Sequence, residues 1–211
     1  VPGLALTTAI AELAEQNLVS GTAKFMQATL ALLALGLSYL LFQQIAHSLH
    51  LKEVLQPIAT KHTTQLVSAL GVVLNIFCFG IIFKVPPRML AWSTLTGLAG
   101  WVALDSLSRT GAAAAAPYLG AVMVGTVSLS LGKVFRLPSQ VFSVPGIVAM
   151  LPGMLALSSF RYFASGDQDT GLEFTFQVAV TAVSIVFGLM TARMPFAVAE
   201  RIQLGRKTNP L

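Results

Sequence analysis

Charged residues are scarce in this chain of 211 residues, and that scarcity indicates its class. Asp, Glu, Lys and Arg make up 10% of the sequence, against about 25% in soluble domains. Hydrophobic residues make up 55%, and the mean hydropathy is +0.77. The composition therefore predicts an integral membrane protein. The formal net charge of +5 does not indicate a nucleic-acid partner, because no basic cluster is interleaved with aromatic residues.

Cysteine pairs and the common catalytic patterns are also missing. The single cysteine, Cys78, lies in an apolar run, so there is no disulfide framework. The sequence has no metal-ligand spacing, no phosphate-binding loop and no Ser, His and Asp set that spacing would unite. We therefore expect no enzyme activity, no cofactor and no metal. His47, His50 and His62 share one polar linker, which we interpret as solvated rather than metal-binding or pH-sensing.

Long apolar runs are what the sequence does have. A spanning helix needs about 20 mainly apolar residues. Residues 4–13 resemble the second half of a span whose first half would precede Val1. The predicted fold is an all-α, polytopic helical bundle with about six transmembrane helices. The six expected spans, of which the third and fourth are diluted by Ser, Thr and Gly, are residues 25–45, 66–83, 89–104, 113–131, 141–163 and 174–191.

The basic residues predict an orientation in the membrane. Nine of the 13 Lys and Arg residues fall on one side of these spans. The positive-inside rule places that side, together with the C-terminus, in the cytoplasm. The expected location is the inner or plasma membrane of the cell. Acidic residues gather on the other side, at Asp105, Asp167, Asp169 and Glu173. The four remaining basic residues also lie there: Lys52, Lys61, Arg109 and Arg161.

A Pro-Gly motif occurs at equivalent places in two parts of the chain. Pro152-Gly153 interrupts an apolar run, and Pro2-Gly3 stands near the start of the sequence. A glycine follows at equal spacing in both cases, Gly21 and Gly171, and then a long apolar segment begins. Proline removes a helix donor and breaks the helix. The predicted orientation gives the two copies opposite topology, and inverted repeats with broken helices are typical of secondary transporters.

Polar groups inside the spans are candidates for function. Asp105, at the outer end of the third span, is the candidate for proton or charge coupling, although Arg109 is spaced to form an ordinary ion pair with it. Asn75 ranks first among uncharged groups. Most Ser and Thr hydroxyls are expected to bond carbonyl groups of their own helix. Close helix packing is the expected role of three glycines, Gly97, Gly100 and Gly125.

Several short motifs follow one another along the chain, beginning with FGIIFKVPPR at residues 79–88. This run resembles the "GF…FNVP" helix end of the threonine/serine exporter family, with Lys84 where the family usually has Asn. Residues 97–101 (GLAGW), Val124-Gly125 and the segment from Pro145 to Gly153 fit its pattern. The opening residues 1–10 and 18–21 are similar to the end of its N-terminal module. The resemblance covers residues 1–41 and 66–196.

The resemblance implies an arrangement of modules. Family members have about ten spans in two five-span modules, fused or on two polypeptides. Residues 1–46 would then end the first module, 47–65 would be an extracytoplasmic linker, 66–195 the second module and 196–211 a basic cytoplasmic tail. The rest of the first module, on the same chain or on a partner subunit, would complete the protein.

The resemblance also implies export of threonine and serine, driven by the proton motive force. Two-polypeptide relatives are linked to succinate export, so a dicarboxylate exporter is an alternative, and a non-transporting anchor or regulatory subunit is another. We expect substrate near the two Pro-Gly breaks, where helix N-termini would face a carboxylate. The residues expected to bind substrate are Pro2, Gly3, Thr7, Asn75, Pro145, Gly146, Pro152, Gly153 and Ser158.

Overall fold

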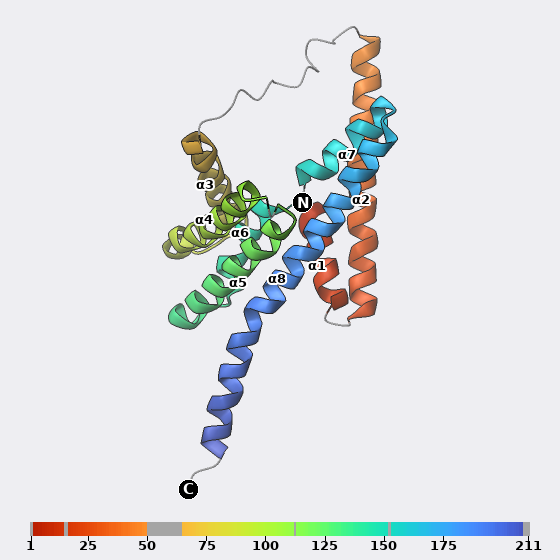
Figure 1. The fold of residues 1–211 in the computed structure, drawn as a ribbon. Helices are drawn as coiled ribbons and strands as arrows, with labels where there is room; N and C mark the ends of the chain where they lie inside the picture. Colours follow the sequence, from red (N-terminus) through yellow and green to blue (C-terminus); the bar gives the residue numbers. More distant parts are fainter. Residues whose placement is uncertain (1, 15–16, 50–64, 112, 152, 209–211) are drawn as a thin grey trace. The chain divides into compact units, whose positions relative to one another are not determined.

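Helices make up almost all of the described part of the chain. The computed structural model describes residues 2–14, 17–49, 65–111, 113–151 and 153–208 (Figure 1). It is 91% helical, and no strand occurs in those ranges. The predicted all-α class is confirmed. The helices are α1 (Pro2–Ala14), α2 (Leu18–Ser48), α3 (Gln65–Ile82), α4 (Pro87–Arg109), a 3-10 turn η1 (Ala113–Ala115), α5 (Ala116–Phe135), α6 (Gln140–Met150), α7 (Gly153–Ser165) and α8 (Gln168–Thr208).

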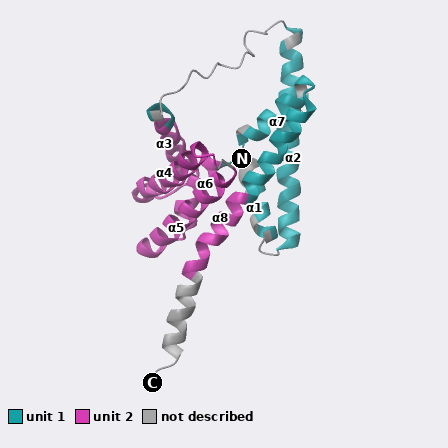
Figure 2. Ribbon diagram, in the orientation of Figure 1, with its two compact units in different colours: residues 1–68, 151–183 teal, residues 69–150, 184–211 magenta. Residues whose placement is uncertain are grey.

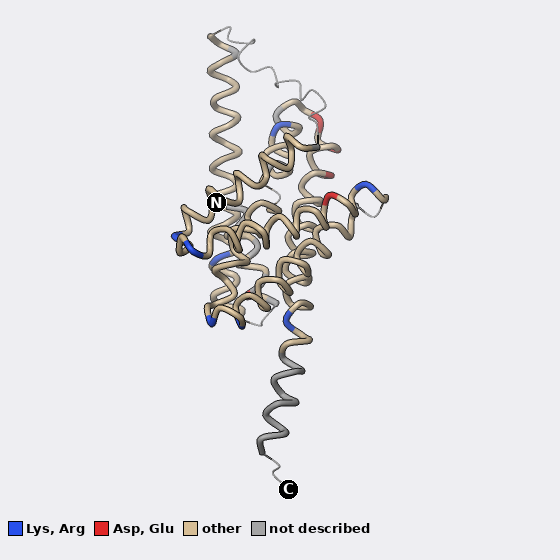
Figure 3. Tube along the Cα trace, turned by 90° about the vertical axis from the view of Figure 1, so that its left-hand side faces the viewer, with Lys and Arg blue, Asp and Glu red and all other residues tan. Residues whose placement is uncertain are grey.

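Four of the described helical segments are long and apolar enough to cross a membrane. They are Leu18–Ala46, Ala116–Phe135, Gln140–Phe163 and Gln168–Phe196, and each coincides with one of the six expected spans. Leu66–Ile82 is a shorter apolar helix. Helix α4 has 23 residues, but its Ser, Thr and Gly residues keep it outside the apolar group. The lengths and apolar compositions of these helices fit a multi-pass membrane protein. Figure 3 shows that the charged residues lie near turns and helix ends.

The chain is interrupted where the Pro-Gly motif predicts a break. Helix α6 ends at Met150 and α7 begins at Gly153; Pro152 itself lies outside the described residues. By contrast, α6 continues through Pro145. The break at 151–152 also coincides with a boundary between two compact units (Figure 2), of which unit 1 holds residues 1–68 and 151–183 and unit 2 holds 69–150 and 184–211. The module boundaries expected at 46, 65 and 195 are a separate matter and stay a prediction.

Unit 1 contains the first copy of the predicted repeat and the second copy as far as Val183. The second copy follows the first by 150 positions, from Gly3 to Gly153 and from Gly21 to Gly171. Helices α2 and α8 begin at equivalent positions, Leu18 and Gln168. The turns between helices also carry equivalent backbone hydrogen bonds: N–H of Asn17 donates to the carbonyl of Glu12 at 2.9 Å, and N–H of Asp167 donates to that of Tyr162 at 3.1 Å.

The glycine of each copy lets two helices approach closely. A Cβ on Gly21 would lie 2.8 Å from Cγ of Leu13, and a Cβ on Gly171 would lie 2.7 Å from Cδ1 of Phe163. Leu13 and Phe163 are themselves 150 positions apart. The same shift relates the residues of the unit 1 core, where Leu6 corresponds to Ala156, Ala28 to Val178 and Leu32 to Ala182.

The two copies run in opposite directions within unit 1. In Figure 1, the α1–α2 turn lies at the lower end of this unit and the α7–α8 turn at its upper end. Because equivalent residues from both copies share one core, the pairs pack against each other as an antiparallel duplicate. Within unit 1 this antiparallel arrangement is the one that the predicted inverted repeat requires, and the opposite orientation of the two copies in a membrane stays a prediction.

Unit 2 is packed through small residues. A Cβ on Gly97 of α4 would lie 2.8 Å from Cα of Gly146 in α6, and one on Gly100 would lie 2.3 Å from a methyl group of Val124. A Cβ on Gly125 would lie 2.5 Å from that of Ala192 in α8. The packing role predicted for Gly97, Gly100 and Gly125 is confirmed.

The turn after α3 places a lysine in an unusual backbone conformation. Lys84 has φ 56°, in the left-handed region that costs most residues about 1–2 kcal/mol and that asparagine tolerates better. N–H of Lys84 donates to the carbonyl of Ile81, and N–H of Val85 to that of Gly80. The left-handed backbone at this position explains a preference for asparagine there, the residue that the sequence resemblance gives as usual.

We expect Gly97→Val to destabilise the protein by about 1–3 kcal/mol, because the new side chain must displace the backbone of α6. The matched control is Gly71→Val on α3, since a Cβ there meets nothing within 4 Å. Thermal unfolding of the two variants in detergent would measure the difference. Equal melting temperatures would contradict the close α4–α6 packing.

We expect Lys84→Asn to stabilise the protein by up to about 1 kcal/mol, because asparagine enters the left-handed region at lower cost. The control is Lys133→Asn, since Lys133 lies within α5, where asparagine has no such advantage. The readout is again the melting temperature in detergent. A lower melting temperature for Lys84→Asn than for the parent would count against the strained turn.

Candidate functional site

The starts of the two repeat helices contribute to one apolar core cluster in unit 1. Ala5 and Leu6, near the N-terminus of α1, pack in one cluster with Leu155 and Ala156, near the N-terminus of α7. The sequence placed Pro2, Gly3 and Gly153 at these helix starts, and α1 and α7 do begin there. The structure thus brings together the two regions where substrate binding is expected. The side chains of Pro2 and Thr7, and all of Pro152, lie outside what the structure describes.

The start of α7 is open. Gly153 is exposed, and a Cβ built on it would meet nothing within 4 Å. The first turn of a helix has N–H groups without partners inside the helix. Together with the helix dipole they favour a negative group near this end. The N–H of Gly153 donates to the carbonyl of Leu151 at 2.8 Å. The other N–H groups in the first turn of α7 therefore suit the carboxylate of a small substrate.

Ser158 is the expected substrate residue that lines a cavity. The cavity has a volume of about 260 Å³, lies within unit 1, and is lined by Gln43, Ser158, Arg161, Tyr162, Ser165 and Phe174. These residues come from the C-terminal parts of α2 and α7 and the first turns of α8. The sequence reasoning treated Arg161 only as a loop charge and missed this grouping.

The cavity wall is ordered by contacts among its own residues. The rings of Tyr162 and Phe174 stack with centroids 5.2 Å apart and planes inclined by 8°. The hydroxyl of Ser165 donates to the carbonyl of Tyr162 at 2.9 Å, and Nε2 of Gln43 donates to the hydroxyl of Tyr39 at 2.9 Å. Arg161 has no hydrogen-bond or ion-pair partner among the described residues. Its donors are therefore available to a ligand.

A second cavity in unit 1, of about 470 Å³, offers different chemistry. It lies between α2 and α7 and is lined by Leu30, Leu33, Ala34, Leu37, Leu40 and Phe160. Next to it, a Cβ on Gly36 would lie 2.4 Å from the ring of Phe160. An apolar lining has nothing to orient a charged substrate. This cavity therefore suits lipid or apolar packing rather than an amino acid.

The other expected site residues lie in unit 2. Pro145 and Gly146 are buried in α6, where Gly146 packs on Gly97. Asn75 is exposed on α3, next to Ile76, which is fully buried. The binding roles of Pro145, Gly146 and Asn75 stay a prediction. Within unit 2, Pro145 and Gly146 are part of the packing of α6.

Most hydroxyls of the spans bond their own helix, as expected. Thr94 donates to the carbonyl of Leu90 at 2.8 Å, and Ser128 to that of Gly125 at 2.9 Å. Ser159 is an exception, because its hydroxyl reaches from α7 to the carbonyl of Gly171 in α8 at 3.1 Å. This bond stabilises the α7–α8 pair at the same place where the glycine allows its close approach.

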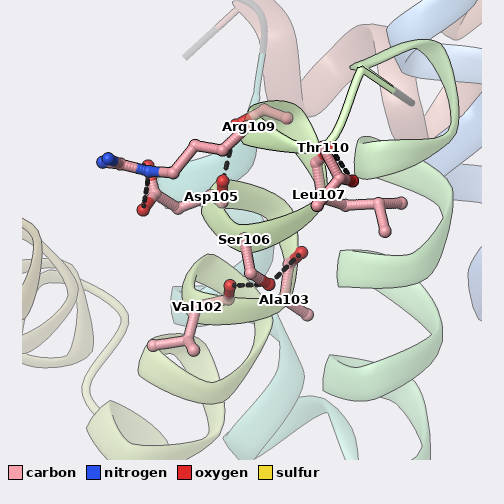
Figure 4. A network of polar contacts seen from close by, with 8 residues as sticks. Val102, Ala103, Asp105, Ser106, Leu107, Arg109 and Thr110 are labelled. Carbon is pink, nitrogen blue, oxygen red and sulfur yellow. Dashed lines mark hydrogen bonds and ion pairs between the residues drawn. The ribbon is translucent and has the colours of Figure 1, made fainter.

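Asp105 is held in an ion pair at the end of α4 (Figure 4). Nε and Nη2 of Arg109 donate to its two oxygens at 2.9 and 3.2 Å. The expected pair is confirmed, and the hydrogen bonds to Asp105 raise the pKa of Arg109 above its ordinary value. Because both carboxylate oxygens of Asp105 accept hydrogen bonds from Arg109, Asp105 has the surroundings of a structural ion pair. A role in coupling stays a prediction.

A second ion pair escaped the sequence reasoning. Glu12 of α1 pairs with Lys24 of α2 within unit 1. The other carboxylate oxygen of Glu12 is buried and has no hydrogen-bond partner in the described part of the chain. A shift of 150 positions aligns Glu12 with Tyr162 and Lys24 with Phe174. Because Tyr162 and Phe174 stack on each other, this alignment predicts a contact between Glu12 and Lys24.

No group of three or more His, Cys, Asp or Glu residues within the described ranges could hold a metal ion. Of the three histidines in the linker, His50 and His62 lie outside those ranges, as do residues 50–64 as a whole. The candidate site consists of the starts of α1 and α7 and of the polar cavity of unit 1.

These features define a class of protein. Apolar helices long enough to cross a membrane mark a multi-pass membrane protein. An inverted repeat with a broken helix is typical of secondary transporters, which place substrate at such breaks.

Comparison with known families agrees with this class. The family model described as "Threonine/Serine exporter, ThrE" matches residues 68–194, more than half of the chain, and "Putative threonine/serine exporter" matches residues 1–46. The chain therefore belongs to the threonine/serine exporter family. This is a family of membrane transporters rather than of enzymes. No curated protein and no solved structure matches the chain significantly.

Proposed function

We propose that this protein exports threonine and serine across the cell membrane, driven by the proton motive force, with its C-terminus in the cytoplasm. The observation that carries the proposal is the match of two exporter families, which together cover most of the chain. A first membrane module, on the same chain or on a partner subunit, completes the transporter. The inverted repeat in unit 1 gives the physical basis for alternating access.

Substrate binds where α1 and α7 begin. The N–H groups in the first turns of α1 and α7 face the α-carboxylate, because they lack partners within their helices; the N–H of Gly153 is not one of them, since it donates to the carbonyl of Leu151. Carbonyl groups freed by the Pro-Gly breaks accept from the α-ammonium group. Thr7, which follows Gly3 by four positions in α1, supplies a hydrogen bond to the rest of the substrate.

Two alternatives make different predictions. A dicarboxylate exporter needs a second cationic group for its second carboxylate, whereas Arg161 is the one basic residue among the described residues that line the polar cavity of unit 1. A non-transporting anchor or regulatory subunit needs no substrate at all. Transport by the purified protein separates all three.

We expect reconstituted protein to exchange threonine in proteoliposomes, and Gly153→Leu to abolish this exchange by blocking the open start of α7. Gly71→Leu is the matched control, because Gly71 and Gly153 both have open space around them and both lie in helices. Radiolabelled counterflow measures the exchange, and the amount of folded protein is checked by gel filtration.

Full exchange by Gly153→Leu would refute the site. Exchange of succinate without threonine would favour the dicarboxylate exporter. Absence of any exchange with small amino acids and dicarboxylates would favour the anchor.

A further inference from the structure

The polar cavity of unit 1 lies at a place where the repeat departs from its own symmetry. Position 161 is arginine in the second copy, whereas the equivalent position 11 is alanine in the first. The hairpin forms with either residue, because two backbone hydrogen bonds recur at equivalent positions of the two turns, those donated by Asn17 and Asp167 and those donated by Gly21 and Gly171. Arg161 is therefore not needed to build the turn.

The aromatic pair departs from symmetry in the same way. Tyr162 and Phe174 stack in the second copy, and the equivalent positions of the first copy carry the Glu12–Lys24 ion pair. A lysine and a glutamate neutralise each other across the first turn. The second turn has an arginine without such a partner in the described residues and a cavity of about 260 Å³ beside it.

We propose that this cavity is a binding site for a small amino acid, in which Arg161 binds the α-carboxylate. The guanidinium group presents several N–H donors in a planar fork that matches a carboxylate. Ser158 and Gln43 line the same cavity and offer hydrogen bonds to a side-chain hydroxyl. The stacked rings of Tyr162 and Phe174 form an apolar wall for the aliphatic part of the ligand.

The size of the cavity fits a ligand of this class. Pockets for drug-sized ligands hold about 300–1,000 Å³, and this cavity of about 260 Å³ is smaller. A molecule with the few heavy atoms of threonine or serine suits that volume.

The surrounding charges favour a zwitterion over a dicarboxylate. The α7–α8 hairpin also carries Asp167, Asp169 and Glu173, and the equivalent positions of the first copy, Asn17, Val19 and Ala23, are uncharged. One arginine among three carboxylates leaves the described α7–α8 hairpin net negative. A dianion is repelled by this field at distances within a Debye length, whereas a zwitterion has no net charge to be repelled.

The site is separate from the binding region at the helix starts. Arg161 follows Gly153 by eight residues, which at 1.5 Å per residue is about 12 Å along α7. In the predicted orientation, the α7–α8 turn faces away from the cytoplasm, so exported substrate reaches the cavity after leaving the helix starts. The inference rests on the proposed function for the identity of its ligand.

The test is protection of a cysteine placed in the cavity wall. Ser165→Cys in a Cys78→Ser background introduces one thiol there, and Val19→Cys in the same background places one at the equivalent end of the other copy, where Val19 is 87% exposed. Maleimide labelling is measured against increasing threonine, threoninol, which lacks the carboxylate, and succinate. We expect threonine alone to protect Ser165→Cys, and no ligand to protect Val19→Cys.

Arg161→Gln should raise the half-protecting threonine concentration about tenfold to a hundredfold, because a charge-assisted hydrogen-bond pair is lost. Arg109→Gln is the matched control, since it removes a basic residue from the same predicted side, outside the cavity, and should change the value less than about twofold. Unchanged protection in Arg161→Gln, protection by threoninol, or stronger protection by succinate than by threonine would each overturn the inference.

The outcome is distinguishable from that of the proposed function. Threonine counterflow by the parent protein together with unchanged protection in Arg161→Gln would remove this site and leave export intact. Arg161-dependent protection without counterflow would support the site and remove export. Persistence of protection in Gly153→Leu would support two separate binding regions, whereas its loss would assign the protection to the helix starts and overturn the inference.

Discussion

The close approach of two helices over a glycine is the contact on which unit 1 depends. Gly21 meets Leu13 and Gly171 meets Phe163 at distances that leave no room for a Cβ. Each glycine lets its long helix fold back onto the short helix before it. The two pairs then bury equivalent residues in one core, including Leu6 and Ala156. That packing also places the starts of α1 and α7, where substrate is expected, beside the shared core of unit 1.

A duplicated hairpin also explains where function resides. Positions that carry glycine in both copies, or an apolar residue in both, build the fold. Positions that differ are free to acquire a role, and the difference is greatest at the turns, where the first copy carries the Glu12–Lys24 pair and the second carries Arg161 beside two stacked rings. An inverted repeat with unlike ends suits a transporter whose two sides face different solutions.

Much of the fold could be predicted from the sequence because its signals are local. The Pro-Gly motif predicted the break before α7, and the spaced glycines predicted the repeat. The roles of Gly97, Gly100 and Gly125 in packing followed from their small size. The polar character of α4, with Ser93 and Thr96 buried in it, already showed as low hydropathy.

The candidate site was predicted less completely, because its residues meet only after folding. Gln43, Arg161 and Phe174 are distant or unremarkable in the sequence, and Arg161 was counted only as a loop charge. Asn75 stood out as an amide within an apolar run, but the helix turns it to the exposed face of α3. The sequence does hold one further signal, because the 150-position shift pairs Glu12 with Tyr162 and Lys24 with Phe174, residues of unlike chemistry at equivalent places.

The central claim is that the two hairpins of unit 1 cross the membrane in opposite directions. Single cysteines at Val19 and Asp169, which are equivalent and both exposed, test it most directly in a Cys78→Ser background. Cells are labelled with a maleimide that does not cross the membrane, before and after lysis. The account predicts that Asp169→Cys is labelled in intact cells and Val19→Cys only after lysis. Labelling of both cysteines from the same side would contradict it.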